Sequence, residues 1–188
     1  MPAITKSSIE RLRKRIVDLQ VRGKDFTLTS GAQGQHYIDI KGACLEPDTL
    51  YTIAGTFVKW MQELGLQVAG GAALGADPIV GAMVIVSALK PFSYPIKGFI
   101  VRKNIGDLGA DNIFEGHSDR GAEAVIVEDV LSMGNSTLHA ARMAQSKGMK
   151  VKNVFVVVDK KRGGAQKLVQ AGFNVRSIFT LASLNLPK

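Results

Sequence analysis

The spacing of apolar residues is helical in the first part of the chain and changes at about residue 67. Between Ile9 and Leu19, apolar residues follow one another at intervals of 3, 4 and 3, which predicts an amphipathic helix over residues 8–22. Residues 26–31 and 35–40 look like two short strands joined by a glycine-containing turn, which indicates a hairpin-like element. Pro47 then opens a second amphipathic helix that reaches about residue 64.

From residue 67 onward, short apolar runs alternate with helical patterns. The expected strands are 67–71, 97–102, 124–130, 151–159 and 174–180, and the expected helices are 79–89, 136–147 and 163–171. Residues 104–120 have no sustained period, so we expect a long loop there, and loops of that length are usually functional. Alternation of strands and helices is typical of an α/β fold built on a parallel sheet.

One stretch, residues 124–137, combines a buried strand with polar groups that suit a ligand. Its continuous apolar run predicts a strand buried on both faces, and Glu128 and Asp129 lie at the carboxyl end, where open α/β sheets bind ligands. The loop that follows leads into a helix through Asn135, Ser136 and Thr137, which are good N-cap residues. Free N–H groups and a helix dipole would bind an anion there, most naturally a phosphate. The pattern therefore indicates a phosphorylated sugar, although an ordinary strand–turn–helix with exposed acids is the alternative.

Composition bounds the class of protein without deciding its function. The 188 residues fit a single domain, and the one cysteine, Cys44, excludes an intramolecular disulfide, so a reducing cytoplasm is expected. No apolar run is long enough for a transmembrane helix, and the three histidines do not stand at a metal-ligand spacing, so no metal ligands are assigned. The net charge of +8 suits an anionic partner, either nucleic acid or a small polyphosphate. With 6% aromatic residues we see no platform for single strands, and a nucleic-acid partner is not expected.

Several motifs together resemble the type I phosphoribosyltransferases, and specifically the orotate phosphoribosyltransferases of pyrimidine synthesis. The stretch 124–137 matches the ribose-phosphate signature of the superfamily. The orotate branch is indicated by five further stretches in the order of the family, which are Phe26–Gly31, Tyr37–Asp39, Gly70–Pro78, Phe99–Lys103 and Val156–Asp159 with the basic cluster after it. The resemblance covers roughly residues 25–180. It implies a parallel sheet flanked by helices, with a small N-terminal hood (about residues 1–45) on a core (46–188).

The resemblance also implies an activity: transfer of ribose 5-phosphate from phosphoribosyl pyrophosphate to a base, orotate first of all, with release of pyrophosphate and with Mg²⁺ as cofactor. Arg102, Lys103 and Asp129 match catalytic positions of the family, and a loop that closes partly over a neighbouring subunit implies a homodimer. The substrate-binding positions implied are Glu128, Asp129, the phosphate loop Ser132, Met133, Gly134, Asn135, Ser136 and Thr137, the turn Ala72, Ala73, Leu74 and Gly75, and Lys160, Tyr37 and Lys41.

The chain departs from the family pattern at several positions of the site. Gly106 stands where the mobile loop usually has lysine and Leu108 where it has histidine, so a cation and a proton donor are missing. Met133, Asn135 and Lys160 replace a small hydroxyl residue, a glycine and an arginine. Two hypotheses follow: a working phosphoribosyltransferase with an altered loop, or a catalytically weakened homologue that binds nucleotide or phosphoribosyl pyrophosphate as a regulator.

Overall fold

The computed structural model describes residues 3–19, 21–27, 33–37, 40–102 and 113–185, with side chains placed outside residues 20–39. Six strands form one sheet in the order β5-β4-β3-β6-β7-β8, in which every neighbouring pair is parallel except β4 and β5. The strands are β3 (Val68–Ala72), β4 (Lys97–Val101), β5 (Phe114–Gly116), β6 (Glu123–Leu131), β7 (Lys150–Asp159) and β8 (Asn174–Thr180). The predicted fold class, a mostly parallel α/β sheet, is confirmed.

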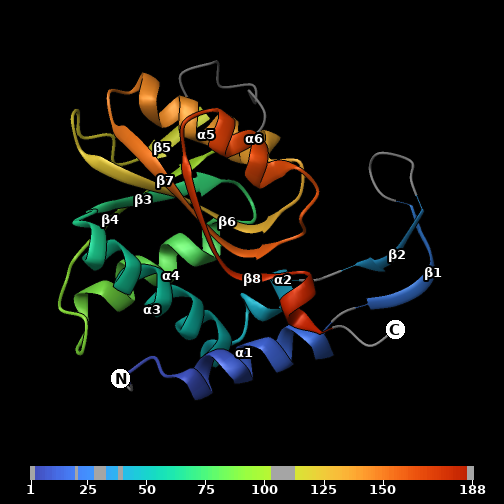
Figure 1. Ribbon diagram of the computed structural model, residues 1–188. Coiled ribbons are helices and arrows are strands. Elements are labelled where there is room, and N and C mark those ends of the chain that lie inside the picture. The colour runs from blue at the N-terminus through green and yellow to red at the C-terminus, as the bar shows by residue number, and fades with distance from the viewer. Residues whose placement is uncertain (1–2, 20, 28–32, 38–39, 103–112, 186–188) are drawn as a thin grey trace.

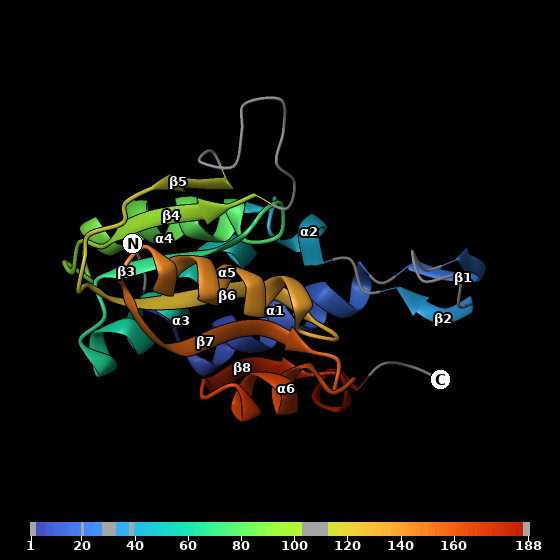
Figure 2. The same ribbon diagram turned by 90° about the horizontal axis from the view of Figure 1, so that it is seen from above.

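Helices cover both faces of this sheet, as Figures 1 and 2 show. On one face lie α1 (Lys6–Asp18), α3 (Pro47–Leu64) and α4 (Asp77–Ala88), and on the other lie α5 (Asn135–Ser146) and α6 (Gly164–Gln170). The central strand β6 divides its side chains between the two, because successive residues of a strand point to opposite faces. Val125 and Val127 join the core under α3 and α4, whereas Ala124 and Ile126 join the core under α5. Burial on both faces explains the continuous apolar run.

A two-stranded antiparallel hairpin, β1 (Val21–Thr27) and β2 (Gln33–Tyr37), extends away from the sheet in both views. The short helix α2 (Ile40–Ala43) follows the hairpin. The last element of the described residues is a 3-10 turn, η2 (Ala182–Leu184). The hairpin is shifted from its predicted place. Val21 and Arg22 were expected in the first helix, which instead ends at Asp18, because these residues pair with Tyr37 and His36 across the hairpin.

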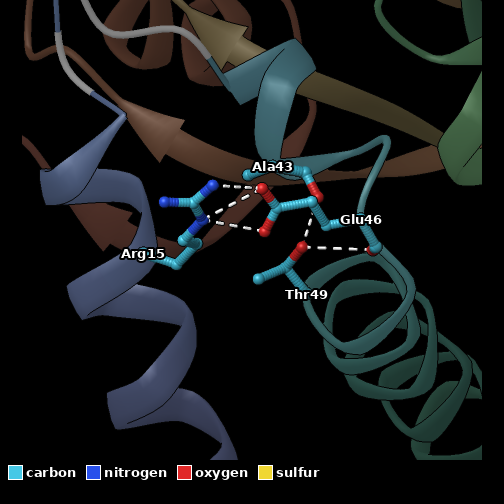
Figure 3. Close-up of polar contacts among 4 residues, drawn as sticks. All are labelled: Arg15, Ala43, Glu46 and Thr49. Carbon is cyan, nitrogen blue, oxygen red and sulfur yellow. Dashed lines mark hydrogen bonds and ion pairs between the residues drawn. The ribbon is translucent and has the colours of Figure 1, made fainter.

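The junction between α1, α2 and α3 is held by polar contacts (Figure 3). The guanidinium of Arg15, near the end of α1, donates to both carboxylate oxygens of Glu46, with Nε 2.8 Å from Oε2 and 3.0 Å from Oε1. The Thr49 hydroxyl, in the first turn of α3, donates to the carbonyl oxygens of Ala43 and Glu46. The Thr49 bond ties the end of α2 to α3, and the Arg15 bonds tie α1 to Glu46, the N-cap of α3. The helix α2, which carries Lys41, is thus attached to a junction that is itself held to α1.

Two further elements were absent from the sequence-based expectation. Strand β5 lies within the segment 104–120 expected to be a loop, and α2 begins at Ile40, which was assigned to a strand. Both are too short to show a period of their own. Phe114 of β5 stacks on Phe99 of β4, with ring centroids 4.8 Å apart, so a contact distant in sequence decides this element.

Candidate active site at the carboxyl ends of the strands

The two acids of β6 lie side by side in sequence but have different neighbours. Glu128 is 6% exposed and Asp129 is 7% exposed. Glu128 is hydrogen-bonded to Thr137 of α5, whereas Asp129 lies against Gly75 of the turn after β3 and near Lys41 of α2. Each carboxylate therefore meets a different set of neighbours, and the strand continues past both to Leu131.

Glu128 is bonded to the first turn of α5. The Thr137 hydroxyl donates to Glu128 Oε2 at 2.6 Å, and the Ser136 hydroxyl lies at 3.5 Å from the same oxygen. Thr137 is 1% exposed. Thr137 is a position of the predicted phosphate loop, and in this structure its hydroxyl is engaged with Glu128.

Asp129 lies beneath the turn that follows β3. Its Oδ1 accepts the Val130 N–H at 2.7 Å, and its Oδ2 lies 3.7 Å from the Lys41 ammonium. A Cβ atom added at Gly75 would come within 2.5 Å of Asp129 Oδ1, so only glycine fits there without displacing the carboxylate. Glycine at this position brings the backbone of the turn directly onto the acid.

The turn itself runs from Ala72 to Ala76 between β3 and α4. Its ends are held by the backbone, since the Ala73 N–H donates to the Val101 carbonyl at 2.9 Å and the Ala76 N–H donates to the Ala72 carbonyl at 3.2 Å. Leu74, at its tip, is 74% exposed, and the peptide bond that precedes it is cis. The turn is thus a short backbone arch of small residues with an exposed tip.

The loop after β6, the predicted anion cradle, leads into the start of α5. Gly134, with φ of 74°, is the N-cap, and its carbonyl accepts the Leu138 N–H at 2.9 Å. The N–H groups of Asn135, Ser136 and Thr137 have no partner within the helix, because they belong to its first turn. The loop predicted to bind phosphate therefore leads into a helix start whose N–H groups lack helical partners, and positions of this kind bind anions in proteins.

The start of α6 packs against the loop after β6 and is hydrogen-bonded to its backbone. The Gly164 N–H donates to the Ser132 carbonyl at 2.9 Å, and a Cβ atom at Gly164 would lie 2.4 Å from that same oxygen. Lys167, one turn further, donates to the Asn135 side chain. Met133, by contrast, is 60% exposed and makes the loop bulkier without adding a polar group.

Basic side chains from two other strand ends face the same edge of the sheet. Arg102 follows β4 and pairs with Glu115 of β5 at 3.0 Å, a partner that the sequence did not indicate. Lys160 follows β7. Burial lowers the pKa of Lys160 below its ordinary 10.5, and Arg162 and Lys41 lower it further, whereas Asp129 acts in the opposite direction. The charges of both Asp129 and Lys41 thus affect the pKa of Lys160.

Asp77, in the first turn of α4, is a residue that sequence reasoning missed. Its Oδ1 is buried and has no hydrogen-bond partner among the residues that the structure describes. Burial raises the pKa of Asp77 above its ordinary 3.8, and Glu115 also raises it. A carboxylate beside a glycine-rich turn was the available signal, in the sequence Gly75–Pro78.

The carboxyl ends of four strands thus bring most of the predicted site together. These are the turn after β3, Arg102 after β4, the acids and phosphate loop of β6, and Lys160 after β7, with Lys41 of α2 beside Asp129. Lys103, Gly106 and Leu108 lie outside the described residues, as does the side chain of Tyr37, so their predicted roles stay predictions. Within the described ranges, no group of three or more His, Cys, Asp and Glu side chains is arranged to hold a metal ion.

An acid pair between an anion cradle and a glycine turn, on a mostly parallel sheet, is the arrangement of a type I phosphoribosyltransferase. The chain matches no family model. It is 35% identical over 159 residues to the orotate phosphoribosyltransferase of Aquifex aeolicus, covering 85% of this chain and 86% of that one. It is 31% identical over 183 residues to that of Mycobacterium avium, covering 97% and 99%.

A solved structure agrees with these relatives. The orotate phosphoribosyltransferase of Mycobacterium tuberculosis H37Rv, in complex with 5-phospho-α-D-ribosyl 1-diphosphate, superposes with a TM-score of 0.79 at 31% identity, over 95% of this chain and 99% of that chain. The chain belongs to the orotate phosphoribosyltransferase family, and it is an enzyme of the transferase class. The resemblance drawn from the motifs is confirmed. None of the helices in the described ranges is long and apolar enough to span a membrane.

Proposed function

We propose that this protein transfers the ribose 5-phosphate of phosphoribosyl pyrophosphate to orotate, giving orotidine 5′-monophosphate and pyrophosphate for pyrimidine nucleotide synthesis. The observation that carries the proposal is the pair of buried carboxylates, Glu128 and Asp129, between the cradle at the start of α5 and the arch at Gly75. The M. tuberculosis relative bound to the same donor supports the choice of substrate.

Each group of the site has a role in this reaction. The free N–H groups of α5 hold the 5-phosphate, and the acids accept hydrogen bonds from the ribose hydroxyls. A ring nitrogen of the base loses its proton and forms a bond to the ribose C1 while the bond from C1 to the pyrophosphate oxygen breaks. The electron pair of the broken bond leaves with pyrophosphate, which takes up the proton directly or through water. Positive charge grows on the ribose in the transition state, and the fixed carboxylates stabilise it.

The leaving pyrophosphate is negatively charged and needs cationic partners. Arg102, exposed at the end of β4, exchanges Glu115 for the pyrophosphate, and the arch Ala72–Gly75 brings backbone groups close to it. The carboxylate oxygens of Glu128 and Asp129 are ligands that suit a hard ion, so Mg²⁺ held with the substrate fits beside them. When bound, Mg²⁺ supplies positive charge to the pyrophosphate oxygens.

Recognition of the base falls to Lys160. Its ammonium stands where the family pattern has arginine, and the neighbouring Arg162 and Lys41 keep this edge basic. A carboxylate on the base, as in orotate, complements that charge. Lysine offers a point charge and arginine a planar fork, so the substitution changes the geometry of the contact while keeping its sign.

The proposal is tested by following orotate consumption with phosphoribosyl pyrophosphate and Mg²⁺. The wild-type protein is expected to turn over, and Asp129→Asn to lose about 10²-fold or more of kcat/KM, because removing one charge-stabilising group typically costs that much. Binding of phosphoribosyl pyrophosphate without turnover of orotate or any other base would instead favour the hypothesis of a regulator. Absence of both binding and turnover would exclude the enzyme and the regulator alike.

We further propose that the enzyme is a cytoplasmic homodimer. Helix α4 is apolar on nearly all sides, yet Ile85 is 63% exposed and Leu89, its C-cap, is 40% exposed, which favours burial against a second copy. Ile85→Glu is expected to give a monomer by light scattering. Val169→Glu, an equal change at a 59% exposed position of α6 on the other face, should leave the mass unchanged.

A further inference from the structure

The hydroxyl of Thr137 is directed away from the phosphate that its position in the loop suggests. Thr137 is the third residue of α5, and its backbone N–H belongs to the anion cradle. A threonine hydroxyl carries a single hydrogen, and here that hydrogen is donated to Glu128 Oε2 at 2.6 Å. The same hydrogen is not available to a phosphate oxygen.

Because both side chains are buried, the Glu128 carboxylate depends on the hydrogen bond from Thr137. Thr137 is 1% exposed and Glu128 is 6% exposed, so water reaches little of either side chain. A buried carboxylate that loses a hydrogen-bond donor is left with an unfavourable desolvation cost, which it relieves by moving or by taking up a proton. Glutamate also has one more rotatable bond than aspartate, so its carboxylate needs more external restraint to keep one orientation.

Neighbouring Ser136 provides a contrast within the same turn. Its hydroxyl lies 3.5 Å from Glu128 Oε2, at the limit of hydrogen-bond distance, and its side chain is partly exposed. The Ser136 hydroxyl therefore makes a longer and more exposed contact with Glu128 than Thr137 does, and it can exchange that contact for an anion in the cradle at less cost.

We propose that Thr137 is a positioning residue that orients the Glu128 carboxylate toward the ribose hydroxyls and takes no part in holding the phosphate through its side chain. The inference rests on the proposed function, because it assigns Glu128 to the ribose. It divides the loop between two tasks: Ser136 and the backbone N–H groups bind the phosphate, and Thr137 prepares the acid.

The test compares three probes by calorimetry: inorganic phosphate, ribose 5-phosphate and 2-deoxyribose 5-phosphate. Thr137→Val removes the hydroxyl at nearly constant shape. It is expected to weaken ribose 5-phosphate on the order of tenfold, the usual scale for a hydrogen bond to a charged group, while phosphate affinity stays within about twofold. The preference of the wild type for ribose over 2-deoxyribose 5-phosphate should shrink, and Thr137→Ser should restore it.

Ser136→Ala is the matched variant, and it should weaken all three probes alike. Equal loss of phosphate and ribose 5-phosphate in Thr137→Val, or no loss of either, would overturn the positioning role while leaving the proposed function in place. A wild-type protein that binds none of the three probes would overturn both the positioning role and the proposed function. If Thr137→Val does not fold, Thr137→Cys replaces it, because cysteine keeps the volume and is a weaker donor. Thr137→Cys should show a smaller loss of ribose 5-phosphate affinity with phosphate affinity unchanged. Any other result counts against the proposal.

Discussion

The acidic and the basic parts of the site are held in different ways. Glu128 and Asp129 are 6% and 7% exposed and are anchored by a buried hydroxyl and a backbone N–H. The side chains of Lys41 and Arg102 are 54% and 52% exposed, and each faces a carboxylate, Asp129 and Glu115 respectively. The acids are thus oriented before substrate arrives, whereas Arg102 must change partner when the pyrophosphate binds.

This difference has an energetic consequence. Fixed groups that already point at developing charge require no reorganisation during the reaction, which is the most effective form of electrostatic stabilisation. Exposed ion pairs contribute little to stability and exchange partners readily. We therefore expect substitutions near the acids to affect catalysis strongly, and substitutions near the cations to have modest effects that depend on pH or salt.

Among variants that keep both acids, Gly75→Ala is expected to lower activity the most. Its Cβ would lie 2.5 Å from Asp129 Oδ1 and 2.7 Å from Asp129 Cγ, so the acid must move or the arch must shift. We expect kcat/KM to fall by about 10²-fold and the free energy of unfolding by roughly 1–3 kcal/mol, the usual cost of overpacking. Steady-state kinetics and thermal unfolding measure the two.

Gly81→Ala is its matched control. Gly81 lies in α4 with no atom within 4 Å of an added Cβ, so alanine there should keep activity and gain about 0.5–1 kcal/mol from helix propensity. If Gly75→Ala were as active as Gly81→Ala, the acids would not need the close arch.

Lys160 is expected to give an intermediate effect that depends on pH. Burial lowers its pKa below the ordinary 10.5, so on an alkaline titration it loses its charge earlier than a free lysine does. Affinity for orotate should therefore decline as the pH rises through the folded pKa. Lys160→Arg stays charged throughout that range, and its affinity should be flat with pH. Inhibition or binding curves from neutral to alkaline pH check this, and parallel curves for the two proteins would remove Lys160 from the base contact.

Releasing Arg102 from Glu115 is expected to have a smaller effect and to improve the binding of phosphoribosyl pyrophosphate. Glu115→Gln removes the carboxylate that Arg102 contacts at 3.0 Å, so the pyrophosphate no longer competes for the guanidinium. The KM for phosphoribosyl pyrophosphate should fall by up to about fivefold at low salt, given the small energy of an exposed pair, and less at high salt. Glu123→Gln removes the same charge from the start of β6, where it pairs with Lys150 at 3.6 Å, and should leave KM unchanged.

The smallest effect concerns the support of α2. The hydrogen bond from Arg15 lowers the pKa of Glu46 below its ordinary 4.5, so the pair stabilises the fold above that pH and ceases to do so as the pH falls through the lowered value. Glu46→Gln should lower the thermal midpoint slightly at neutral pH, and the difference from the wild type should vanish in acid. Glu10→Gln, which removes a pair within α1 alone, should not change the KM, whereas Glu46→Gln should raise it slightly through Lys41.

The local sequence was sufficient for the strand, the acids and the phosphate loop. The apolar run before Glu128 needs burial on both faces, and the helix after Gly134 needs an N-terminus with free N–H groups, so both follow from residues adjacent in the chain. The same holds for α3, whose apolar face and Pro47 are visible in the pattern.

Tertiary structure alone decided which groups meet. Thr137 bonding to Glu128, Glu115 bonding to Arg102, and Gly75 lying on Asp129 each join residues whose neighbours in sequence give no sign of the contact. Strand β5 and helix α2 exist because of such partners, and the shift of the hairpin has the same origin. Periodicity reports how one segment meets the core, whereas these contacts depend on how separate segments are placed together, and that is set by the packing of the whole chain.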